Sequence, residues 1–188
     1  MGAPQVRGAR DAVVAPLTVW TIGHSVRTAD ELIAALRAYD IELVADVRRF
    51  PGSRRLPQFA ASALEVELGA VGIAYCSLSV LGGRRQPLRD SPNDGWRVAA
   101  FRGYADYLAT EDFANGLMEL LMLAEGLRTA VMCAEVLWWR CHRRLIADVL
   151  VTLGIRVMHI RDATTIEEHR LAAPARLVRG TLSYSADG

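Results

Sequence analysis

The stretch TAVMCAEVLWWRCHRRLIAD, residues 129–148, decides the fold of this chain. It begins with a short apolar run (AVM) of the kind that forms a strand buried on both faces. It leads into a helix, because apolar residues recur at helical spacing up to Leu153 and Gly154 follows where a helix would end. In parallel α/β sheets ligands bind beyond the carboxyl ends of strands. That position is occupied here by reactive, stacking and anion-pairing side chains: Cys133, Glu135, Trp138, Trp139, Arg140, Cys141, His142 and Arg143.

The remaining sequence alternates in the same way. We predict five strands, at residues 17–22, 41–47, 73–78, 130–132 and 155–160, and helices at residues 29–39, 60–68, 96–108, 111–125 and about 142–153, with a last short helix after Thr164 and Thr165. Thr28 and Glu31 have the spacing of a capping box, which opens a helix. Strands alternating with helices predict a three-layer α/β fold, with a mostly parallel five-stranded sheet and helices on both faces. We expect a mobile tail over residues 1–16, a single domain over 17–178 and a loose tail over 179–188.

Composition sets the class of protein. The chain has 188 residues, of which 52% are hydrophobic and 23% charged, as in an ordinary globular domain. It contains no apolar run long enough to cross a membrane and no recognisable signal peptide, so we expect no membrane partner. Three cysteines, an odd number, argue against a disulfide framework and favour the cytoplasm. The sequence names no cofactor and gives no oligomeric state.

Polar and reactive residues follow each of the five predicted strands, and we expect them at one edge of the sheet. They are His24 and Ser25, Asp46 and Arg48, the Gly82-Gly83-Arg84-Arg85 loop, Cys133 and Glu135, and His159.

The order of these motifs resembles the bacterial family catalogued as domain of unknown function 488, over about residues 19–169. The resemblance rests on TIGHS (21–25), DVR (46–48) with Pro51, Ser53, Arg54, Pro57 and Phe59, LGG (81–83), FRGYADY (101–107), CAE (133–135), CHR (141–143) and HI (159–160). It implies an α/β fold and marks these positions as the family's pattern, but it implies no activity. The adjacent tryptophans stand outside that pattern.

All 22 basic residues are arginines, and twelve of them lie in three short clusters. The clusters are Arg48, Arg49, Arg54 and Arg55; Arg84, Arg85, Arg89, Arg97 and Arg102; and Arg140, Arg143 and Arg144. A coding bias would explain the absence of lysine but not the clustering. The guanidinium fork pairs with phosphate or carboxylate, so we predict an anionic partner. The residues we expect to bind it are Ser25, Asp46, Arg48, Ser53, Arg54, Arg140, Cys141, His142 and Arg143.

Cys133 is the predicted nucleophile or redox thiol, since a thiol beside a helix start and arginines has a lowered pKa. Its place after a central strand is similar to the active-loop cysteine of rhodanese-like and phosphatase-like sites. The phosphatase loop requires an arginine six positions after the cysteine, whereas Arg140 lies seven after Cys133. His24 and Glu135 are the predicted proton carriers. The alternative for Cys133 is a small buried side chain without chemistry.

A metal site is the weaker interpretation of Cys133, Cys141, His142 and His24, although all four are zinc ligand types. The two cysteines are eight positions apart, no CxxC pair is present, and adjacent residues on a helix point about 100° apart. We therefore predict no metal. Other structural alternatives are an anchoring ion pair between Asp46 and Arg48, a structural His159 and tryptophans that cover the core.

Together these patterns predict an enzyme with an anion-binding cleft at the strand ends, acting on a phosphate-bearing substrate such as a nucleotide or nucleic acid. A non-catalytic nucleic-acid-binding module, with arginines on phosphates and tryptophans stacking on bases, is the alternative. A sulfur-transfer or metal-dependent enzyme is a further alternative.

Overall fold

A computed structural model describes residues 16–52 and 56–186 of the chain. The tail predicted for residues 1–16 lies almost entirely outside this part, and so do two predicted site residues, Ser53 and Arg54.

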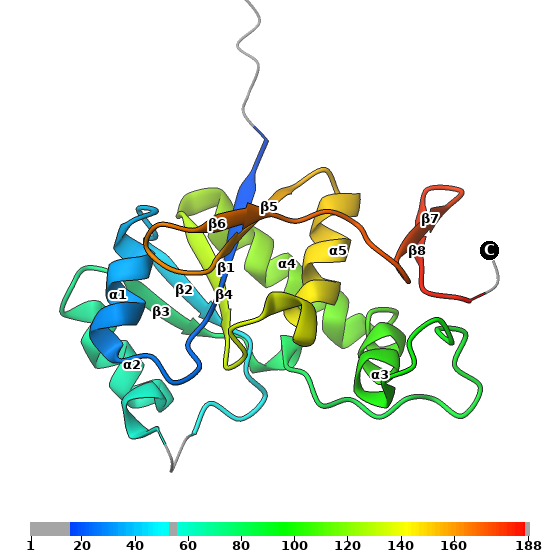
Figure 1. Ribbon diagram of the computed structural model, residues 1–188, viewed down its shortest axis with the longest axis horizontal. Coiled ribbons are helices and arrows are strands. Elements are labelled where there is room, and N and C mark those ends of the chain that lie inside the picture. The colour runs from blue at the N-terminus through cyan, green and yellow to red at the C-terminus, as the bar shows by residue number, and fades with distance from the viewer. Residues whose placement is uncertain (1–15, 53–55, 187–188) are drawn as a thin grey trace, which may run out of the picture.

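One six-stranded sheet forms the centre of the fold, with strand order β3-β2-β4-β1-β5-β6 (Figure 1). The strands are β1 (Thr18–Gly23), β2 (Leu43–Asp46), β3 (Ala74–Ser77), β4 (Thr129–Cys133), β5 (Arg156–Ile160) and β6 (Ile166–Glu168). The first five are parallel, as predicted, and their carboxyl ends therefore share one edge. β1 and β4 are buried almost throughout because other strands pair with both of their edges and helices cover both of their faces.

β6 replaces the short helix that we predicted after Thr164, and it pairs antiparallel with β5. The backbone N–H groups of Thr164 and Thr165 both donate to Asp162 Oδ1, at 2.8 Å. The threonines therefore close a tight turn around the aspartate instead of capping a helix. Ile166 follows directly and pairs with Ile160.

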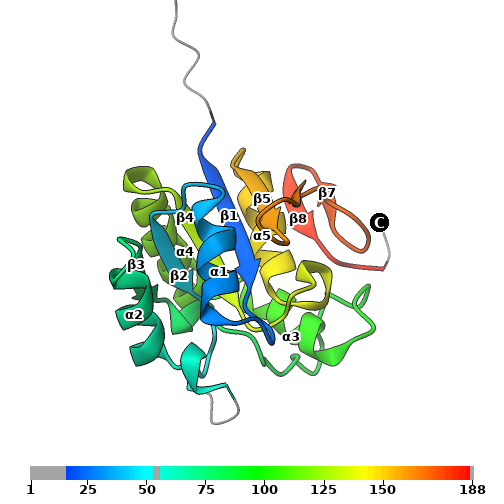
Figure 2. The same cartoon turned by 60° about the vertical axis from the view of Figure 1, so that its left-hand side comes forward.

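Helices cover both faces of the sheet, which confirms the three-layer α/β fold (Figure 2). α1 (Ala29–Arg37) and α2 (Ala61–Gly69) cover one face, while α4 (Glu111–Gly126) and α5 (Arg143–Thr152) cover the other. α3 (Ala99–Tyr107) and three short 3-10 turns, η1 (Pro57–Phe59), η2 (Ser79–Leu81) and η3 (Trp138–Arg140), complete the connections. The Thr28–Glu31 capping box is formed as predicted. Alternate residues of the five parallel strands enter the two separate apolar cores.

The C-terminal residues form a hairpin instead of the loose tail that we predicted from residue 179. β7 (Arg176–Val178) pairs with β8 (Thr181–Ser183) beside α5 (Figure 1). Tyr184, the next residue, is 2% exposed, and its hydroxyl donates to Asp148 Oδ2 at 2.9 Å. A tyrosine that is apolar over most of its surface and polar at its tip thus anchors the hairpin.

Within the described residues, none of the helices has the length and apolar character needed to span a membrane. β1 and β2, the two neighbours of β4 in the sheet, are followed by α1 and α2 on one face. β4 is followed by α5 on the opposite face. Such a change of direction opens a crevice at the carboxyl ends of the strands. The end of β4 therefore lies at the topological switch point of the sheet.

Candidate functional site

A cavity of about 540 Å³ lies at this switch point. Six of the residues predicted for the site line it: Arg48, Cys133, Glu135, Arg140, Cys141 and His142. Its volume is in the range of small-molecule sites. The predicted convergence of the β2 and β4 ends, 85 or more positions apart in the chain, is therefore present in the structure.

Two thiols and one imidazole meet at the wall of this cavity. Cys133 is the last residue of β4, and Cys141 and His142 precede α5. The His142 Nδ1 atom lies 3.6 Å from Cys141 Sγ and 3.9 Å from Cys133 Sγ. All three donor atoms are within 4.8 Å of one another. We call these three residues the Cys-Cys-His cluster.

The backbone conformation of Cys141 explains how adjacent residues reach the same point. We expected both Cys141 and His142 on the helix, with side chains about 100° apart. Cys141 is instead extended (φ −127°, ψ 150°), whereas His142 is helical (φ −58°, ψ −19°). The change of backbone direction between them brings both side chains to Cys133, so the geometric objection to a shared ligand does not hold.

His142 is held in one orientation. Its Nε2 lies 3.2 Å from the Val47 carbonyl oxygen, which can only accept, so Nε2 carries the proton and Nδ1 presents a lone pair to both thiols. The Tyr104 ring packs against the imidazole, with centroids 5.0 Å apart. Gly83 lies on another side, where a Cβ atom would come within 2.8 Å of Nδ1. We predicted His142 to be a substrate-binding residue; the structure brings it against the thiols.

The surroundings shift the pKa values of the two thiols in opposite directions. Burial opposes ionisation of Cys141, but a hydrogen bond from Cys133 and the positive charge of the nearby Arg143 lower its pKa well below the ordinary value. The same hydrogen bond, together with burial, raises the pKa of Cys133. The sequence predicted the lowered pKa for Cys133, whereas the structure assigns it to Cys141, whose Sγ is 3.4 Å from Arg143 Nε.

Arg143 is buried beside the cluster, with 1% of its surface exposed. Besides Cys141, its guanidinium donates to Thr21 Oγ1 at 3.4 Å and to the Glu135 carbonyl. These contacts fix the turn after β4 and place a positive charge next to the thiols. A guanidinium engaged in this way is a positioning group, not the free anion receptor that the arginine clustering predicted.

Asp46 and Arg48 form the anchoring ion pair that the sequence analysis considered as an alternative. Arg48 Nε donates to both carboxylate oxygens of Asp46, at 2.9 and 3.0 Å, and the Tyr75 hydroxyl also donates to Asp46. A further Arg48 nitrogen donates to the Phe59 carbonyl at 2.7 Å. Arg48 therefore lines the cavity, but its guanidinium group already donates to other groups of the protein.

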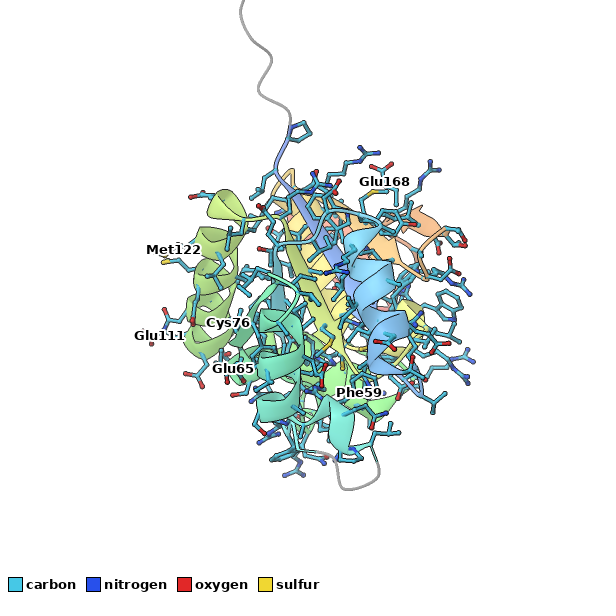
Figure 3. The ribbon with its side chains drawn as sticks, turned by 90° about the vertical axis from the view of Figure 1, so that its left-hand side faces the viewer. Phe59, Glu65, Cys76, Glu111, Met122 and Glu168 are labelled. Atoms are coloured by element: carbon cyan, nitrogen blue, oxygen red, sulfur yellow. The ribbon has the colours of Figure 1, made fainter. Side chains whose placement is uncertain are left out.

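His24 and Ser25 lie behind the cavity and are not among its lining residues. His24 Nδ1 donates to the Ser25 carbonyl at 3.0 Å, and Nε2 accepts from Arg48 at 3.2 Å. The ring also stacks on Phe59, which lies near the lower end of α1 in Figure 3. Burial lowers the pKa of His24 to about 4. Both nitrogens are engaged, so the geometry favours a structural role over proton transfer.

The open side of the cavity carries exposed charge. Arg49, Arg84 and Arg140 line it, together with Glu135 and with Trp139, which is 37% exposed. Arg49 and Arg84 were missed as site residues, although both belong to the clusters noted in the sequence. Arg49 donates to the Arg84 carbonyl at 2.8 Å, which ties the loops after β2 and β3 together. Phe101 of α3, from the FRGYADY motif, was missed too and adds an apolar wall.

His159 belongs to a separate buried chain of hydrogen bonds. It lies 2.7 Å from Thr21 Oγ1 and 3.0 Å from His169, and His169 lies 2.8 Å from Asp148. The pKa of His159 is lowered to about 2, mainly by burial and also by the neighbouring His169 and Arg143. Trp138 stacks on the ring with centroids 4.2 Å apart. His159 is thus a buried structural residue and half-buried Trp138 covers it, as the structural alternatives predicted.

Residues 28–150 match the family described as domain of unknown function DUF488. The chain belongs to the DUF488 family. No curated protein and no solved structure matches it significantly. The matched segment runs from the start of α1 to near the end of α5, so it contains the entire Cys-Cys-His cluster and every arginine of the cavity wall. The family description supplies no activity, and the chemistry must be argued from the site.

Proposed function

We propose that this DUF488 protein is an enzyme acting on a phosphate-bearing substrate, with the Cys-Cys-His cluster as its reacting centre. The observation that carries the proposal is that the cluster and three exposed arginines line one cavity at the switch point of the sheet. Anchoring residues alone would not require an open cavity beside two thiols. Catalytic groups are concentrated in such crevices of α/β folds.

The arrangement supports a division of roles. Arg49, Arg84 and Arg140 would pair with phosphate oxygens, since each is exposed and guanidinium matches that geometry. Trp139 offers an aromatic face on which a base can stack. The substrate class that meets both features is a nucleotide or a nucleic acid.

The arginine contribution can be measured directly. Binding of adenosine monophosphate and of a short labelled oligothymidylate would be compared for the wild type and Arg140→Gln. We expect affinity to fall about tenfold, because one charge-assisted hydrogen bond is worth about 1.5 kcal/mol. Arg37→Gln is the matched control, since Arg37 is exposed at the far end of α1. Equal loss in both variants would show nonspecific attraction and overturn the assignment.

A nucleic-acid-binding module without catalysis is the second candidate, favoured by Trp139 beside the arginines. Cys141→Ser distinguishes the two. Nucleotides and oligonucleotides incubated with the protein would be analysed for products by mass spectrometry. The enzyme proposal expects turnover that Cys141→Ser abolishes while binding is retained. Binding of oligothymidylate with steep salt dependence and no product from any substrate would favour the module.

A further inference from the structure

We propose that the Cys-Cys-His cluster binds one Zn²⁺ ion, with Cys133 Sγ, Cys141 Sγ and His142 Nδ1 as its ligands. The zinc ion would be the part of the site that reacts with the substrate of the proposed enzyme. The proposal rests on that function only where it assigns water or substrate to the fourth ligand position of the ion. Metal binding itself can be measured without any substrate.

The distances between the donor atoms fit tetrahedral zinc. Zn–S bonds of about 2.3 Å and Zn–N bonds of about 2.0 Å at tetrahedral angles place sulfur and nitrogen about 3.6 Å apart. The observed separations from His142 Nδ1 are 3.6 Å to Cys141 and 3.9 Å to Cys133. The whole set lies within 4.8 Å, so only a small closure of the thiols would complete the three-ligand geometry.

The surroundings orient the ligands as zinc sites do. A zinc-bound histidine commonly donates its other N–H to a backbone carbonyl, which fixes the ring and its tautomer. His142 Nε2 is placed to donate to the Val47 carbonyl, which leaves Nδ1 to the cluster. Arg143 donates to Cys141 Sγ, and it ties the turn after β4 through the Glu135 carbonyl. These contacts hold the donors before any ion binds.

Three protein ligands beside an open cavity are typical of a catalytic zinc site, in which water or substrate takes the fourth position. Glu135 lines the same cavity and lies two positions after Cys133. In zinc deaminases a glutamate two positions after a ligand moves protons without binding the metal. We assign Glu135 the corresponding role: it would take a proton from the bound water and return it to the leaving group, so that the net reaction is hydrolysis.

Cobalt substitution tests the metal site on the full-length protein. The protein would be treated with a chelator under reducing conditions, then titrated with Co²⁺ and finally with Zn²⁺. We expect one Co²⁺ per chain, thiolate-to-metal absorbance in the near ultraviolet, intense visible bands from four-coordination, and loss of both on adding Zn²⁺. Azide added to the Co²⁺ form before any Zn²⁺ should shift its visible bands, because the fourth position is open.

Variants separate ligands from neighbours. Cys133→Ser and Cys141→Ser should each lose about half of the near-ultraviolet absorbance and bind Co²⁺ at least tenfold more weakly. Glu135→Gln should keep the full spectrum. Cys76→Ser is the matched control, because Cys76 lies on the edge strand β3 and is the one cysteine outside the cluster (Figure 3). Circular dichroism confirms that each variant is folded.

The outcomes distinguish the two proposals. Absence of a thiolate–Co²⁺ band in the folded wild type, or a band of undiminished intensity in Cys141→Ser, overturns the zinc site. Either result leaves the arginine-dependent binding of nucleotide to be judged by its own experiment. Conversely, Co²⁺ binding as expected together with unchanged nucleotide affinity in Arg140→Gln would support the zinc site and overturn the proposed anion-binding cleft.

Discussion

At the scale of single residues, the site depends on backbone details that side-chain types do not reveal. The sequence predicted that Cys133, Cys141 and His142 belong to one site, because strand ends of a parallel sheet share an edge. It did not predict that Cys141 is extended while His142 begins the helix, and that difference decides whether the two can contact the same atom. Nor could it distinguish buried Arg143 from exposed Arg140, since their contacts come from distant segments.

Gly83 provides a residue-scale prediction. In Gly83→Ala the new Cβ would lie 2.8 Å from His142 Nδ1 and 3.1 Å from its Cγ, so the imidazole must shift and its Nδ1 loses its present position beside the thiols. We expect Co²⁺ affinity to fall by about 10- to 100-fold, as when other groups that orient a ligand are altered. Gly52→Ala is the control, since Gly52 also lines the cavity but its added Cβ has no atom within 4 Å. Equal Co²⁺ affinity in the two variants would contradict the placement of His142.

At the scale of elements, the C-terminal hairpin differs from the loose tail that we expected at the end of the chain. Residues 179–188 have few large apolar side chains. One tyrosine is enough to dock the hairpin, because Tyr184 buries its ring against Trp96 and its hydroxyl reaches Asp148 of α5. That carboxylate also accepts from His169 and so joins α5, the hairpin and the β5–β6 region.

Docking of the hairpin can be tested by urea unfolding. Tyr184→Phe should lower the free energy of unfolding by about 1 kcal/mol through the lost hydrogen bond, and Tyr184→Ala by about 3–5 kcal/mol through the lost ring. Leu177→Ala on β7 is the control, because Leu177 is 53% exposed and such changes stay within about 0.5 kcal/mol. If Tyr184→Ala were as mild as Leu177→Ala, the hairpin would not be docked in solution.

At the scale of the whole molecule, the layers followed from the sequence because local periodicity and the rules for parallel sheets determine them. Short apolar runs separated by amphipathic helices leave few other ways to bury both faces of each strand. Strand order and β6 did not follow, since they depend on which edges pair across the assembled sheet. The buried polar network also required the structure: it links Thr21 of β1, His159 of β5 and Asp148 of α5 through His169.

Two buried histidines in this fold predict how the whole molecule responds to acid. The pKa values of His24 and His159 fall from 6.5 to about 4 and about 2 in the folded state, chiefly through burial. The unfolded chain therefore takes up protons first as the pH drops below 6.5, and protonation favours unfolding. Both histidines contribute between about pH 6.5 and 4, and below that range only His159 does.

The expected slope is large enough to measure. Each histidine should lower the free energy of unfolding by at most about 1.4 kcal/mol per unit fall in pH. Because the unfolded histidines are only partly protonated at pH 6, the pair gives about 2.4 kcal/mol between pH 6 and pH 5. Urea unfolding would be followed over this window with a chelator present, so that metal release adds nothing. Because His159 accepts from Thr21 and stacks on Trp138, His159→Gln would destabilise the fold at every pH but should halve the slope. A slope unchanged by this substitution would mean that His159 already holds the extra proton in the folded protein, so that its Nδ1 donates to Thr21 instead of accepting from it.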